Sequence, residues 1–152
     1  MSPDGRFLYA VDLGIDKIMI YDLTQGTFAP AAQPFVRTAP GAGPRHFVFH
    51  PQRPFAYVIN ELNSTITAYA VDAADGSLTE MTTVPTLPAD YQGDNSCADV
   101  HITPDGQFLY GSNRGHDSLV IYEIDAQTGG LAFVGHQSVL GKTPRNFAID
   151  PT

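Results

Sequence analysis

The sequence predicts an all-β fold made of repeated four-stranded antiparallel units. The main observation is an internal repeat: residues 2–23 (SPDGRFLYAVDLGIDKIMIYDL) and 103–124 (TPDGQFLYGSNRGHDSLVIYEI) align without a gap and share ten of 22 positions. Residues 50–71 (HPQRPFAYVINELNSTITAYAV) fit the same frame. The marker prolines are spaced 48, 53 and 47 residues apart, at Pro3, Pro51, Pro104 and Pro151. A period near fifty residues is typical of one blade of a β-propeller.

Each repeat carries the signals of short strands joined by tight turns. In the middle repeat, aromatic and β-branched residues predict strands at 46–49, 55–59, 65–71 and 78–84. Asp-Gly pairs between such runs favour hairpin turns. The 12 prolines and 14 glycines leave little room for long helices. An immunoglobulin-like sandwich is the alternative, but that fold does not need near-identical units every fifty residues.

We expect a single partial propeller domain over residues 1–152, with about three blades. Residues 1–35 supply a blade whose inner strand would precede Ser2, residues 44–87 and 97–140 supply a full blade each, and residues 144–150 supply the inner strand of a further blade. Closed propellers usually have four to eight blades. The sequence therefore predicts a segment of a larger propeller, with sequence lost at both ends.

Composition excludes several classes of protein. A hydrophobic content of 43% and 16 Phe and Tyr residues argue against a disordered chain. No apolar run approaches the roughly 20 residues of a membrane-spanning helix. The net charge of -8 argues against nucleic acid as a partner. The lone cysteine, Cys97, cannot form an internal disulfide, and no signal peptide is visible, so we expect a cytoplasmic protein. The oligomeric state is left open.

The repeat frame gathers charged residues at one rim of the channel. Glu61 and Arg114 occupy the same repeat position, just after the second strand of their blades. Because the first and second strands are antiparallel neighbours, Arg45 and Arg145, which precede inner strands, lie at that same rim. Three of the eight basic residues thus converge on one rim. Three polar residues stand one position before the Glu61 column: Asp12, Asn60 and Asn113.

These residue types suit the binding of an anion and the activation of water. The planar fork of arginine binds carboxylate or phosphate. Glu61 between arginines stays ionised and is able to orient or deprotonate a water. The alternative is that the Arg45–Glu61 and Glu61–Arg114 contacts are salt bridges between blades. His46 and His50 have the i, i+4 spacing of a metal site, although a hydrogen-bonding role is the commoner one, and His101 is expected to face the channel.

Four segments resemble the lactonase family of seven-bladed propellers: PGAGPRHFVFHP (40–51), YVINELNSTITAY (57–69), DVHITPDGQFLYGSNRGHDSLVIY (99–122) and GKTPRNFAIDP (141–151). That family includes the propeller-type 6-phosphogluconolactonase and a carboxy-muconate lactonising enzyme. The resemblance covers nearly the whole chain. The NEL and NRGHDS motifs are specific to the family, while PDG-FLY is shared by many propeller repeats. Seven blades imply a protein of about 350 residues.

The resemblance implies catalytic roles for Glu61, Arg45 and Arg114, and the family's histidine would come from a segment before Met1, so we expect this chain to be inactive alone. It also implies hydrolysis of a small anionic sugar lactone, 6-phosphogluconolactone, to 6-phosphogluconate in the pentose phosphate pathway, without metal or organic cofactor. Six further residues are expected to bind substrate: Arg145, Asn60, Asn113, His46, His101 and Asp12.

Two other functions stay open at this point. A muconate-type cycloisomerase would use the same anion-binding rim. A non-enzymatic scaffold or recognition propeller of the YVTN type is suggested by Tyr57-Val58-Ile59-Asn60. The motif of that second family does not call for Glu61 and Arg114 in one column, so the pair favours the lactonase. The absence of tryptophan argues against a WD-repeat adaptor.

Overall fold

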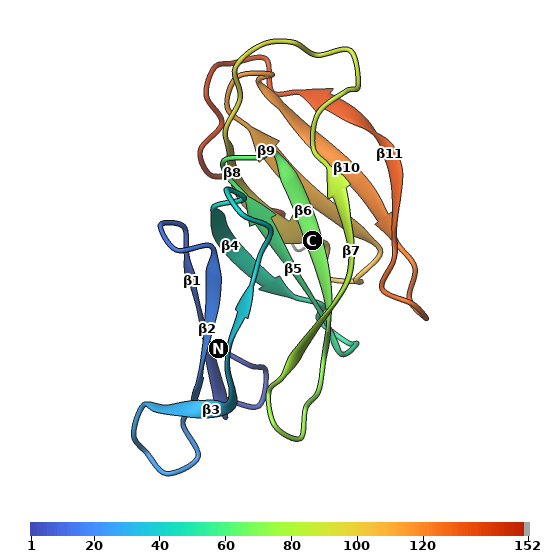
Figure 1. The fold of residues 1–152 in the computed structure, drawn as a ribbon. Helices are drawn as coiled ribbons and strands as arrows, with labels where there is room; N and C mark the ends of the chain where they lie inside the picture. Colours follow the sequence, from blue (N-terminus) through green and yellow to red (C-terminus); the bar gives the residue numbers. More distant parts are fainter. Residues whose placement is uncertain (151–152) are drawn as a thin grey trace.

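The fold consists of three antiparallel sheets arranged side by side (Figure 1). The computed structural model describes residues 1–150, which contain eleven strands and no helix. No segment of those residues is a helix able to cross a membrane. The strands are β1 (Phe7–Asp12), β2 (Lys17–Asp22) and β3 (Ala29–Arg37) in the first sheet, β4 (Pro44–Phe49), β5 (Phe55–Asn60), β6 (Thr65–Val71) and β7 (Leu78–Pro85) in the second, and β8 (Cys97–Ile102), β9 (Phe108–Asn113), β10 (Ser118–Ile124) and β11 (Leu131–Ser138) in the third.

Burial along the strands follows the position of each sheet in the row. Every residue of β5 is buried, because the second sheet is covered on both faces by its neighbours. A strand that is buried on both faces has a nearly continuous apolar sequence, and the sequence of β5, FAYVIN, fits this pattern. The outer strands β7 and β11 are mostly exposed beyond their first residues. This gradient is that of propeller blades, which pack face to face around an axis.

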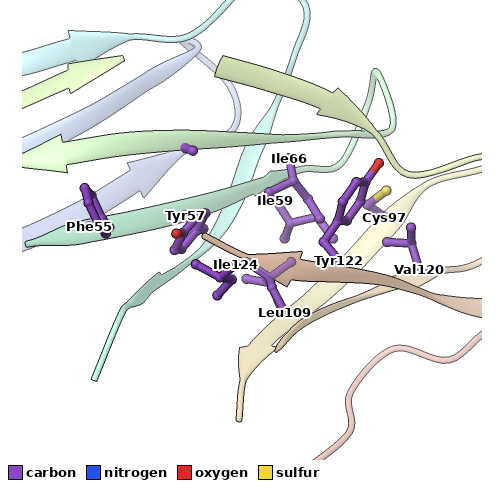
Figure 2. Close-up of a cluster of buried hydrophobic side chains, with 11 residues drawn as sticks. Phe55, Tyr57, Ile59, Ile66, Cys97, Leu109, Val120, Tyr122 and Ile124 are labelled. Atoms are coloured by element: carbon purple, nitrogen blue, oxygen red, sulfur yellow. The ribbon is translucent and has the colours of Figure 1, made fainter. Parts of the chain in front are cut away.

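Two hydrophobic cores fill the spaces between successive sheets. The first, between sheets one and two, is formed by Phe7, Tyr9, Ile18, Ile20, Ala31, Val58, Tyr69 and Leu78. Figure 2 shows the second, in which side chains from β5 and β6 meet those from β8, β9 and β10. Tyr57, Ile59 and Leu109 are fully buried there. The cores lie between sheets rather than within one, so each blade is stabilised by the next.

One hydrogen bond recurs at each junction between blades. The Tyr9 hydroxyl donates to the Gly76 carbonyl at 2.7 Å, and the Tyr57 hydroxyl donates to the Gly129 carbonyl at 3.0 Å. Both glycines have positive φ, +75° and +70°. A Cβ on Gly129 would also lie 2.7 Å from the Phe55 ring. Glycine is therefore required here both by the backbone conformation and by the close approach of the next blade.

The linkers between blades differ in length. Residues 38–43 connect β3 to β4 with six residues, whereas residues 86–96 connect β7 to β8 with eleven and form the long loop at the top of Figure 1. These five extra residues account for the difference between the spacings of 48 and 53 in the sequence. The longer linker is fastened by Asn95, whose Nδ2 donates to the Ser64 hydroxyl at 2.9 Å.

The four strands predicted in the middle repeat are confirmed, each to within two residues at either end. The first sheet has three strands and ends at Arg37, two residues beyond the expected boundary. The strand expected at 144–150 does not form. A strand needs a partner for its backbone groups, and no strand of the described residues pairs with this segment. Pro151 and Thr152 lie outside the described residues.

Candidate active site

Glu61 stands at the end of a buried strand, and its backbone is held from both sides. β5 ends at Asn60, and Glu61 opens the turn to β6. The Glu61 N–H donates to the Gly43 carbonyl at 2.7 Å, and its own carbonyl accepts from the Cys97 N–H at 3.1 Å. Gly43 precedes one inner strand, and Cys97 begins the next. The side chain is therefore fixed where two blades meet.

The carboxylate of Glu61 bridges two arginines. Arg45 Nε lies 2.8 Å from Glu61 Oε2, and Arg114 Nη2 lies 2.8 Å from Oε1. The three side chains are only 17%, 20% and 12% exposed for Arg45, Glu61 and Arg114. The proximity of Arg45 and Arg114 to Glu61, predicted from the repeat frame, is confirmed. Short contacts between partly buried ions are the stronger kind of charge-assisted hydrogen bond.

Both arginines also donate hydrogen bonds to backbone carbonyls of β8. Arg45 Nη1 donates to the Ala98 carbonyl at 2.6 Å, and Arg114 Nη2 donates to the Cys97 carbonyl at 2.9 Å. Arg114 Nε is buried and has no hydrogen-bond acceptor among the residues that the structure describes. The arrangement fixes two guanidinium groups beside each other at one rim, where they can bind and polarise an anionic or carbonyl oxygen.

A second polar cluster lies beside the first, centred on Asp99 of β8. The His46 Nδ1 is 2.6 Å from Asp99 Oδ1, and the His101 Nε2 is 3.0 Å from Oδ2. The amide nitrogen of Asn146 donates to Oδ2 at 2.6 Å. Asp99 is 3% exposed, while the two imidazoles are 41% and 38% exposed. Burial alone would raise the pKa of Asp99, but hydrogen bonds from His46, the Phe147 N–H and His101 outweigh it and lower that pKa.

The histidines line a hollow on the inner wall of the sheets, between β1, β4 and β8. Val11, Arg45, His46, Asp99 and His101 are among the residues around it. Arg45 links the two clusters, because it pairs with Glu61 and its Nη1 lies 3.3 Å from His46 Nε2. A continuous polar network therefore runs from Arg114 through Glu61, Arg45 and His46 to Asp99.

Asp99 was not among the residues singled out from the sequence, although the repeat holds the signal for it. His46, Asp99 and Asn146 occupy the same repeat position, 53 and 47 residues apart. Equivalent positions on successive blades lie at one height around the axis, and these three meet through hydrogen bonds. Comparison of the inner-strand column, in the way that the Glu61 column was compared, would have found it.

Other sequence-predicted site residues lie apart from the network. Asn60 and Asn113 are 1% and 0% exposed. Asn60 donates to the hydroxyls of Thr65 and Thr67, and Asn113 to the Thr86 carbonyl, which are bonds that hold turns and linkers.

Asp12 and Arg145 are exposed, and the ion pairs of Glu61 are made with Arg45 and Arg114 instead. Asp12 accepts a bond from the Gly14 N–H within its own turn. Arg145 forms no ion pair within residues 1–150.

The histidine pair with metal spacing does not converge. His50 is buried, and its Nε2 contacts the Gly106 carbonyl, away from the Asp99 partner of His46. Among the described residues, no three His, Cys, Asp or Glu side chains are placed to hold a metal ion. Cys97 is fully buried beside Thr86, and burial raises the pKa of its thiol.

Fold and site together define an incomplete β-propeller with an acid–arginine cluster at one rim of its channel. The chain belongs to the lactonase family of 7-bladed β-propellers, whose family model matches residues 1–152. The resemblance and the propeller fold expected from the sequence are thereby confirmed.

Curated relatives are similar over the whole of this chain. A 6-phosphogluconolactonase of Bacillus subtilis (strain 168) is 40% identical over 151 residues, which are 99% of this chain and 43% of that relative. A 6-phosphogluconolactonase of Pectobacterium carotovorum is 40% identical over 153 residues, 46% of its length. The chain thus spans less than half the length of these relatives.

Solved structures show the same likeness. A periplasmic gluconolactonase of Pseudomonas aeruginosa superposes with a TM-score of 0.92 at 39% identity, covering 99% of this chain and 42% of that one. A putative 6-phosphogluconolactonase of Bacteroides fragilis gives a TM-score of 0.88 at 37% identity, covering 98% of this chain and 43% of its own. Identities of this size over all three sheets support the assignment of the blades to one family.

Proposed function

We propose that the intact protein containing this chain hydrolyses a sugar lactone, 6-phosphogluconolactone, to 6-phosphogluconate. The observation that carries the proposal is the Arg45–Glu61–Arg114 cluster, held at 2.8 Å contacts on the rim of a lactonase-family propeller. Relatives named 6-phosphogluconolactonase point to the phosphorylated substrate. We place the reaction in the pentose phosphate pathway and the protein in the cytoplasm, which cell fractionation tests.

In the proposed reaction, the residues of the cluster bind the substrate and polarise its carbonyl group. A phosphorylated lactone offers a dianionic group and a carbonyl whose oxygen gains negative charge when water attacks. In the proposal, Arg45 and Arg114 hold the anionic groups of the substrate and stabilise that oxyanion. Glu61 aligns both guanidinium groups, so that no reorganisation is needed as charge develops.

The test is an assay of the intact gene product on three lactones: 6-phosphogluconolactone, unphosphorylated gluconolactone and a muconolactone. We expect 6-phosphogluconolactone to be the best substrate and Arg114→Ala to lower its kcat/KM by about 10²-fold or more. Asp105→Asn, in an exposed turn outside the network, is the matched control. Faster turnover of the muconolactone would favour the cycloisomerase, and inactivity on all three would refute the proposal.

A further inference from the structure

The proposed reaction needs a group that accepts a proton from the attacking water. Glu61 is poorly placed for this, because each of its carboxylate oxygens accepts a hydrogen bond from a guanidinium at 2.8 Å. A carboxylate with both oxygens engaged orients its partners more readily than it takes a proton. The histidine that the family resemblance implies would precede Met1 and is not part of this chain. Among the described residues, the acceptor should therefore be sought next to the arginines, where His46 is the imidazole that contacts one of them.

The contacts of His46 fix which of its nitrogens carries the proton. Arginine has only donors, so the contact of Arg45 Nη1 with His46 Nε2 at 3.3 Å makes Nε2 the acceptor. Nδ1 must then carry the hydrogen and donate it to Asp99 Oδ1 at 2.6 Å. Two independent partners thus select the same neutral tautomer, with its lone pair at Nε2. Unlike the 2.8 Å ion pairs of Glu61, the contact of Arg45 with Nε2 is long, because the short bond of Nη1 goes to the Ala98 carbonyl at 2.6 Å. A water can therefore replace Arg45 at Nε2 more readily than at the Glu61 oxygens.

Asp99 is built to hold this tautomer in place. Its carboxylate is nearly inaccessible and accepts backbone bonds from Val100 at 3.1 Å and Phe147 at 3.2 Å. A buried carboxylate that orients an imidazole and supports its positive charge is the arrangement of acid–base catalysis in many hydrolases. His101 is turned differently, since its Nε2 faces Asp99 at 3.0 Å. The charged and titratable residues that line the hollow with His46 are Asp99 and His101 from β8, Arg45 from β4 and Tyr9 from β1.

We propose that His46 is the proton acceptor of the reaction and that Asp99 is its positioning residue, an inference that rests on the proposed lactone hydrolysis. The water oxygen bonds to the lactone carbonyl carbon while one water proton passes to His46 Nε2, and the carbonyl electron pair moves to its oxygen. When the oxyanion reforms the double bond, the ring C–O bond breaks. The leaving ring oxygen takes the proton from His46. The product is the open hydroxy acid, and the imidazole returns to its neutral form.

The first experiment reads the tautomer without any turnover. In ¹⁵N-labelled intact protein, we expect the His46 ring to show a protonated Nδ1 and an unprotonated Nε2. Asp99→Asn removes the acceptor-only carboxylate and should shift His46 toward the Nε2–H form, because an amide N–H can then donate to Nδ1. Asp105→Asn should leave the His46 signals unchanged. A wild-type His46 that carries its proton on Nε2 would overturn the proposal whatever the activity.

The second experiment is kinetic, on the substrate that the wild type hydrolyses best. His46→Gln should lower kcat by about 10²- to 10⁴-fold with KM changed by no more than a few-fold, and Asp99→Asn should lower kcat by about 10²-fold. A His46→Gln enzyme with wild-type kcat would overturn this inference and leave the lactonase proposal standing. A wild type inactive on every lactone would instead remove the proposed function, which is a different result. Circular dichroism checks that each variant is folded. Because the His46 side chain is partly exposed, we expect its replacement to disturb folding less than the replacement of Asp99.

Discussion

Replacing Glu61 by glutamine separates the structural role of the cluster from its chemical role. Glutamine keeps the shape of the side chain and one acceptor oxygen, but it removes the charge that Arg45 and Arg114 share. A hydrogen bond to a charged group contributes about 1.5–3 kcal/mol, and the side chains here are at most 20% exposed. One of the two ionic bonds is lost, and the glutamine N–H then faces a guanidinium. We therefore expect a loss of about 2–3 kcal/mol in the free energy of unfolding, measured by urea denaturation of the intact protein.

The activity of Glu61→Gln should fall further than its stability explains. With the two guanidinium groups no longer aligned, kcat/KM for the lactone should drop by about 10²-fold, since small misplacements of polarising groups are costly. Tyr57→Phe is the matched control, because it removes the buried bond to the Gly129 carbonyl at 3.0 Å. We expect that loss to cost about 1–2 kcal/mol while activity at 25 °C stays near wild type.

The comparison of the two variants has a clear refuting result. If Glu61→Gln and Tyr57→Phe lose stability to a similar extent and both keep full activity, the Arg45–Glu61–Arg114 contacts are salt bridges between blades and nothing more. If Glu61→Gln has the free energy of unfolding of the wild type, the carboxylate does not stabilise the fold through its 2.8 Å contacts with Arg45 and Arg114.

Three further predictions concern other parts of the chain. Gly129→Ala should lower the free energy of unfolding by about 2 kcal/mol or more, because positive φ costs an alanine about 1–2 kcal/mol and its Cβ would meet Phe55; an unchanged thermal midpoint would contradict this. Hydrogen bonds lower the pKa of Asp99 in the fold, so its contribution to stability is present above the unfolded value of about 3.9 and is lost as pH falls through the folded value. The drop in stability between about pH 5 and pH 2 should therefore be shallower in Asp99→Asn, as followed by urea titrations. Burial and a raised pKa should keep Cys97 unreactive toward a thiol reagent in the native protein; rapid labelling without denaturant would show that the core between the second and third sheets opens.

The repeat made the position of Glu61 predictable from the sequence. A fixed period places equivalent residues at one height around an axis, and antiparallel pairing puts the start of an inner strand beside the end of its neighbour. These two rules are enough to bring Arg45 and Arg114 to Glu61. They depend on backbone geometry, which the pattern of Pro-Asp-Gly turns and aromatic strands specifies locally.

The side chains outside that column were harder to predict, for physical reasons. Asn60 and Asn113 share a repeat position near the rim, but their amides are turned into the fold, toward the Thr65 hydroxyl and the Thr86 carbonyl, and a shared position alone does not show on which side a side chain is buried. Residues 144–150 have the sequence of an inner strand, and the expectation of a strand there stays a prediction, because strand formation depends on a pairing partner as well as on composition. Periodicity specifies where a residue lies more reliably than what it contacts.

The unequal linkers have a consequence for how such a protein can diversify. The additional residues of segment 86–96 are accommodated entirely outside the strands, and the segment passes the turn where Arg114 and Glu61 stand, since Arg114 donates its backbone N–H to Ser96. Gly115 permits this passage, because a side chain there would overlap the Asp94 carbonyl. We expect insertions or deletions between its tethered residues to leave the strand pairing within both adjoining blades unchanged. The entrance to the channel can thus be remodelled by natural variation while the framework beneath it keeps its geometry.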